Sequence, residues 1–130
     1  MTTPFWCLFV VAMLPYVLAG LSGYFKIKQF GRLDSNHPRI QAAELRGIGA
    51  RTYASQMNAW EAVALFAAAV LVAHLAGADP RLSARASVIF VIARLIHPVL
   101  YISNLATLRT GAFTLGLLCS VWLFVLAAQA

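Results

Sequence analysis

Apolar residues run in four long stretches along the chain, joined by three more polar connections. The stretches cover about residues 5–24, 51–76, 82–105 and 110–130. An α-helix needs roughly 20 such residues to cross a bilayer. The pattern therefore predicts an all-α membrane protein, a four-helix transmembrane bundle. One domain over residues 1–130 is expected, because no low-complexity linker divides the chain.

The only long polar segment, residues 25–50, is predicted to be a loop on the cytoplasmic side. Its basic residues outnumber Asp34 and Glu44: they are Lys26, Lys28, Arg32, Arg39 and Arg46. Loops with an excess of lysine and arginine stay on the cytoplasmic side of a membrane. With four spans, both termini are then expected outside.

Composition supports the membrane prediction and narrows the classes of partner. The chain is 62% hydrophobic and 11% charged, with a net charge of +6, whereas a soluble domain carries about 25% charged residues. Because the cations flank apolar stretches, we expect them to contact lipid headgroups and not nucleic acid. Cys7 and Cys119 lie inside apolar stretches and are expected to be buried as small hydrophobic residues. No metal site is predicted.

The second stretch opens with polar residues that hydrocarbon does not tolerate. Four of them share one face of a helix by their spacing: Arg51, Ser55, Asn58 and Glu61. Gln56 lies to the side of this face. A carboxylate such as Glu61 costs about 2.5–3.5 kcal/mol at the centre of a bilayer. The face must therefore be directed toward protein, water or a ligand.

A second polar face lies on the third stretch, with residues three or four positions apart: Arg94, His97, Tyr101 and Asn104. The second and third helices run in opposite directions. At 1.5 Å per residue, Asn58 and Glu61 lie roughly 8 and 12 Å in from Tyr53. The corresponding depths of Tyr101, His97 and Arg94, measured from Leu105, are roughly 6, 12 and 17 Å. The two faces are thus expected to meet in the inner half of the membrane.

Two interpretations of these faces remain open. Buried charges pair by default, so Glu61 and Arg94 are expected to form an ion pair that fastens two helices together. Clusters of ionisable residues within a membrane usually mark function, so the set as a whole is interpreted as a ligand site. Arg51 and Arg109 flank it at the inner boundary. The excess of arginine favours a ligand with carboxylates or phosphates.

Three local patterns, in this order and on these helices, also carry a resemblance. They are Arg51 with Gln56-x-Asn58-x-x-Glu61, then Ala93-Arg94-Leu95-Ile96-His97-x-x-x-Tyr101, then Arg109-Thr110. The chain resembles the MAPEG proteins, membrane-associated proteins in eicosanoid and glutathione metabolism, and in particular their bacterial members. The resemblance covers nearly the whole sequence. It implies a homotrimer in the bacterial inner membrane, with glutathione bound between neighbouring subunits near the cytoplasmic face.

The resemblance also implies roles for individual residues. Glutathione would be bound by residues of the second and third helices: Arg51, Gln56, Asn58, Glu61, Arg94, His97 and Tyr101. Arg109 would stabilise the glutathione thiolate, and Thr110 would assist. A nearby guanidinium lowers the pKa of a thiol from about 8.5. The implied function is a glutathione transferase or peroxidase that uses glutathione as cosubstrate, acts on lipophilic electrophiles from the bilayer and needs no metal.

Two departures keep other functions open. Catalytic relatives commonly carry an arginine at the position of Ala54, and some carry an aromatic hydroxyl at the position of Phe113. A non-catalytic protein that binds a lipid or glutathione is therefore the second hypothesis, since a fold does not settle activity. A small multidrug exporter is a distant third. Exporters of that kind carry a glutamate in their first span, which here has no charge.

Overall fold

The computed structural model describes residues 1–130 as five helices and no strand. The helices are α1 (Thr3–Phe30), α2 (Pro38–Ala43), α3 (Gly47–Ala76), α4 (Pro80–Ile102) and α5 (Ala106–Ala128). Four of them, all but α2, are long and apolar enough to cross a membrane. The prediction of an all-α, four-helix transmembrane bundle is confirmed.

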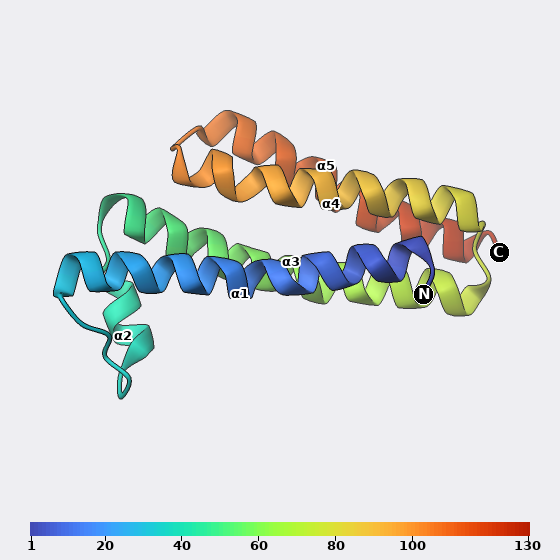
Figure 1. The fold of residues 1–130 in the computed structure, drawn as a ribbon. Coiled ribbons are helices and arrows are strands. Elements are labelled where there is room, and N and C mark those ends of the chain that lie inside the picture. Colours follow the sequence, from blue (N-terminus) through green and yellow to red (C-terminus); the bar gives the residue numbers. More distant parts are fainter.

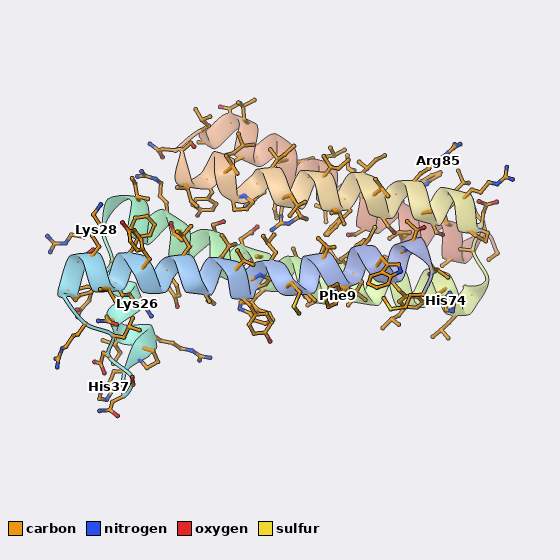
Figure 2. All side chains as sticks on the ribbon, viewed as in Figure 1. Phe9, Lys26, Lys28, His37, His74 and Arg85 are labelled. Carbon is orange, nitrogen blue, oxygen red and sulfur yellow. The ribbon has the colours of Figure 1, made fainter.

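The four long helices lie side by side in two antiparallel pairs (Figure 1). α1 packs along α3, and α4 packs along α5. Both termini and the α3–α4 turn lie at one end of the bundle, and α2 lies at the other. Figure 2 places Lys26, Lys28 and His37 at the α2 end, and His74 and Arg85 at the terminal end. That the α2 end faces the cytoplasm stays a prediction from its positive charge.

Residues 25–50 are mostly helical, and the expectation of a continuous loop is wrong. α1 continues to Phe30, α2 forms within the segment, and α3 begins at Gly47. A helix needs no apolar residues to close its backbone hydrogen bonds, so α1 can run on beyond the hydrocarbon. It ends at Gly31, which adopts a left-handed conformation (φ 76°) and donates its N–H to the carbonyl of Ile27 at 2.8 Å. Lys26 therefore lies on a helix.

α4 ends earlier than its apolar pattern predicts. Its last residue is Ile102, and Asn104 has a φ of 60°. Asparagine is among the few residues that adopt this conformation readily. The turn is closed by the N–H of Leu105, which donates to the carbonyl of Leu100 at 2.9 Å. Asn104 thus lies in the α4–α5 turn, and its expected place on a helix face is wrong.

The core is built on small residues and one aromatic stack. The rings of Phe66 and Phe90 are parallel, with their centroids 3.9 Å apart. Ala69 and Ala73 are fully or almost fully buried on α3. Lipid is as apolar as a protein core, so helices in a membrane associate through close packing, which small residues permit. Cys7 and Cys119 are free thiols buried in the same core.

Gly49 sets how closely the first turn of α3 approaches α1. A Cβ at this position would lie 3.1 Å from the Cβ of Phe25 and 3.1 Å from Cδ2 of Leu45. We expect Gly49→Ala to reduce the free energy of unfolding by about 1–3 kcal/mol relative to Gly23→Ala, because overpacking forces neighbours apart. Gly23 is the control, since its Cβ would meet nothing within 4 Å. Thermal unfolding in detergent measures both variants, and equal midpoints would contradict the prediction.

Asp34 organises the turn before α2. Its Oδ1 accepts hydrogen bonds from the N–H groups of Asn36 and His37, each at 3.0 Å. The bond from His37 contributes most to holding the pKa of Asp34 below its ordinary value of 3.8. A lowered pKa in the folded state stabilises the turn above pH 3.8, and this stabilisation is lost as the pH falls through the folded-state pKa.

Acidification should therefore loosen this turn in the native chain and not in Asp34→Asn. The amide proton shifts of Asn36 and His37, followed by NMR from neutral to acidic pH, measure the transition. An identical transition in both proteins would show that another group controls the turn.

Candidate functional site

The two predicted polar faces meet at Asn58 in the middle of the bundle. Nη2 of Arg94 donates to Oδ1 of Asn58 at 2.7 Å and to its backbone carbonyl at 3.2 Å. Nδ2 of Asn58 donates to Oε2 of Glu61 at 3.3 Å. One residue from each predicted face thus takes part in the same contact. Arg94 is 2% exposed, so Asn58 supplies both hydrogen bonds of a guanidinium that is buried inside the bundle.

The expected direct ion pair between Glu61 and Arg94 is absent. The one ion pair within 4.0 Å joins His37 to Asp34 in the polar segment. Asn58 lies between the two charges because its amide accepts from one and donates to the other. The three residues therefore form a bridged chain across α3 and α4, with the carboxylate of Glu61 left exposed on the protomer.

A small cavity adjoins this chain between α3, α4 and α5. It has a volume of about 160 Å³ and is lined by Asn58, Glu61, Arg94 and, from α5, Phe113 and Leu117. Nε of Arg94 is buried and has no hydrogen-bond partner. The cavity thus combines charged and apolar side chains in its lining.

A second cluster forms where α4 ends and α5 begins. The guanidinium carbon of Arg109 lies 4.3 Å from the centre of the Tyr101 ring, which is a cation–π distance. The His97 ring meets the same tyrosine edge-on, with centroids 5.7 Å apart. Nε of Arg51 donates to the carbonyl of Ile102 at 2.9 Å, so α3 is fastened to the end of α4 beside this cluster. Arg51, Tyr101 and Arg109 are half-buried.

Thr110 and Gln56 do not join either cluster. Thr110 is exposed, and its Oγ1 donates to the carbonyl of Ala106 in its own helix at 3.0 Å. Gln56 lines a different cavity, of about 290 Å³, between α1, α2 and α3. The predicted site residues of one chain are therefore divided between two faces of the bundle.

The cavity at Gln56 contains residues that the sequence interpretation missed. Lys26 and Arg39 line it, as does Ser22, whose buried Oγ has no hydrogen-bond partner. The sequence feature that could have identified this cavity is the four-residue spacing of Ser22 and Lys26, which places both on one helix face. This spacing is informative only if the helix continues past residue 24, as α1 does.

The matched family covers almost the same part of the chain as the bundle. The MAPEG family model matches residues 3–129, from the first residue of α1 to the residue that follows α5. A comparison with curated proteins found no match. The resemblance carried by the three local patterns is thus confirmed over the whole bundle, and the chain is an integral, multi-pass membrane protein that belongs to the MAPEG family.

Proposed function

We propose that the protein is a membrane-embedded glutathione-dependent transferase or peroxidase that acts on lipophilic electrophiles. The observation that carries the proposal is the cluster of Arg109, Tyr101 and His97 at one end of a MAPEG bundle. A half-buried guanidinium beside an aromatic hydroxyl can stabilise a thiolate. The exposed apolar faces of the helices are open to lipid, from which a lipophilic substrate can arrive.

The division of the site between two faces supports a homotrimer. Gln56 lines a cavity between α1, α2 and α3, whereas Arg109 lies on α5 and Tyr101 lies on α4. One ligand cannot contact both sets within a single protomer. In a closed ring of three copies, the first face of one subunit can meet the second face of its neighbour. Glutathione is then bound between subunits, at the α2 end.

The residues on these faces match the groups of glutathione. The ligand has two carboxylates, which suit the cations Arg51, Lys26 and Arg39. Its amides suit Gln56 and Asn58, and its ammonium suits the exposed carboxylate of Glu61. Arg94 has both of its bonds to Asn58 and is 2% exposed, so we assign it the support of Asn58.

In this mechanism the protein mainly positions the thiol and stabilises its charge. Arg109 holds the sulfur as thiolate, whose attack on a carbon electrophile forms a thioether and expels the leaving group. Attack on a peroxide breaks the O–O bond and, with one proton, gives an alcohol and the sulfenic acid of glutathione, which a second glutathione converts to the disulfide and water. Tyr101 and His97 are the neighbouring groups that would donate to the sulfur or to the departing group. Nδ1 of His97 is buried and makes no other hydrogen bond.

Titration of the purified protein with glutathione tests the proposal. We expect heat of binding together with ultraviolet thiolate absorbance, and turnover of 1-chloro-2,4-dinitrobenzene. S-methylglutathione is the matched control ligand, because it keeps the peptide and cannot ionise at sulfur. Absence of glutathione binding would refute the assignment of the site.

A non-catalytic binding protein is the second candidate, favoured by Ala54 and by Phe113. The apolar ring of Phe113 lines the cavity beside Asn58 and Glu61, where some relatives have an aromatic hydroxyl. Ala54 has no charged side chain, so the arginine common at this position in catalytic relatives is missing. Binding of glutathione without a thiolate signal would establish this role. We further propose that the protein lies in a bacterial inner membrane with its basic α2 end in the cytoplasm.

A further inference from the structure

A large cavity lies at the end of the bundle opposite Arg109. Its volume is about 560 Å³, within the roughly 300–1,000 Å³ of small-molecule sites. It is bounded by the first residues of α1, the last turn of α3, the α3–α4 turn, the first turns of α4, and α5. Both termini lie at this end in Figure 1. None of the residues assigned to glutathione lines it.

The lining combines an apolar floor with a polar rim. Val70, Ala73 and Leu123 form buried apolar walls. Thr2, Thr3, His74 and Ser83 supply the polar side chains. A hydrocarbon chain with a hydrogen-bonding head matches both parts of the lining.

Ser83 provides an independent indication of a ligand. It is 6% exposed, and its Oγ has no hydrogen-bond partner. Three other buried hydroxyls in the bundle donate to the carbonyl four residues earlier: Thr52 to Ile48, Ser87 to Ser83 and Ser120 to Gly116. Ser22, Ser55 and Ser83 have no partner, and of these three only Ser83 lines this cavity. A buried hydroxyl without a partner costs about 1–3 kcal/mol, so an acceptor in the cavity would recover that cost.

His74 and Phe5 stand together beside the cavity. Their rings meet edge-on with centroids 4.9 Å apart, and His74 is exposed at the terminal end of the bundle (Figure 2). The ends of transmembrane helices lie at the depth where the polar groups of lipids begin. A ligand head beside His74 and Ser83 would therefore lie at the level of the lipid ester groups, with its chain directed into the bundle.

We propose that this cavity binds an amphiphile, with a carbonyl or hydroxyl head that accepts a hydrogen bond from Ser83 and a hydrocarbon chain against Val70, Ala73 and Leu123. The site is separate from the glutathione site and does not depend on the proposed activity.

Photolabelling of the full chain in detergent tests this site. The probe is 1-oleoylglycerol with a diazirine in its acyl chain, and the labelled peptides are mapped by mass spectrometry. We expect labelling on the segments that contain Val70 and Leu123. Ser83→Ala should lower it about two- to tenfold, the effect of one hydrogen bond. Ser87→Ala is the matched control, because Ser87 bonds within its helix and does not line the cavity.

Two further measurements distinguish a site from general lipid contact. Unlabelled 1-oleoylglycerol should compete with the probe, whereas hexadecane, which has no hydrogen-bonding head, should compete at least severalfold less well. Ser83→Ala should unfold at the same or a higher temperature than the native protein, because it removes an unsatisfied hydroxyl. Equal labelling of Ser83→Ala and the native protein, equal competition by hexadecane, or labelling only on lipid-facing residues would each overturn the proposal.

Discussion

Replacing Arg109 by alanine is expected to abolish the thiolate absorbance of bound glutathione and to lower kcat/KM about 10²–10³-fold, the usual effect of removing one charge-stabilising group. The guanidinium stands at the junction of α4 and α5, 4.3 Å from the Tyr101 ring, and no other cation contacts that ring. Without it, the thiol returns to a pKa near 8.5 and is mostly protonated at neutral pH. Ultraviolet titration and steady-state turnover measure the two effects.

Two variants make this test specific. Arg109→Lys should retain part of the thiolate signal, because an ammonium keeps the charge and loses the planar fork of the guanidinium. Arg85→Ala should behave like the native protein, since Arg85 is exposed at the opposite end of the bundle (Figure 2). A full thiolate signal in Arg109→Ala would remove Arg109 from the mechanism.

Asn58→Ala is expected to reduce the free energy of unfolding by about 3 kcal/mol, since it leaves a buried charged group short of a partner. Arg94 has both of its hydrogen bonds to Asn58, and the shorter one, at 2.7 Å, goes to the side chain that this variant removes. No other hydrogen bond of the Arg94 guanidinium compensates for this loss, since Nε of Arg94 is buried and has no partner either. Thermal unfolding in detergent, with a binding measurement for glutathione, determines the loss.

The double variant Asn58→Ala, Arg94→Met should regain most of this stability. Replacing both members of a buried polar pair by apolar groups is often close to neutral, whereas removing one member is costly. Gln56→Ala is the matched control on the same helix, since Gln56 has no hydrogen bond to a buried charge. If the double variant were as unstable as Asn58→Ala, the cost would come from packing and not from Arg94.

The sequence was sufficient to predict four apolar helices and to place both polar faces in the same half of the membrane. Counting at a fixed rise per residue nevertheless set Asn58 at roughly 8 Å and Arg94 at roughly 17 Å from the inner boundary, whereas their hydrogen bond at 2.7 Å shows that they lie at one level. The count began at Tyr53 and Leu105, but α3 begins at Gly47 and α4 ends at Ile102. The same counting could not choose partners, because Asn58 and Glu61 lie one turn apart on the same face. The expected ion pair was therefore replaced by an amide bridge.

The face on which a residue lies was harder to predict than its depth. Gln56 is two positions from Asn58, so it faces α1 and α2 instead of α4. Whether the two faces form one site depends on neighbouring copies of the chain, which a single sequence does not describe. The helix in residues 38–43 was missed as well, because six residues carry too little periodicity to distinguish a helix from a turn.

The amide bridge between α3 and α4 also bears on how the chain enters the membrane. Glu61 and Arg94 each cost about 2.5–3.5 kcal/mol when inserted alone. Asn58 can bond Glu61 within α3, but it can offset the cost of Arg94 only when both helices are present, and the turn that joins them, from Gly77 to Asp79, is short. Translocation of α3 and α4 as one hairpin avoids a stage at which Arg94 faces lipid without a partner. The order of synthesis favours this route, since α4 follows α3 directly from the ribosome.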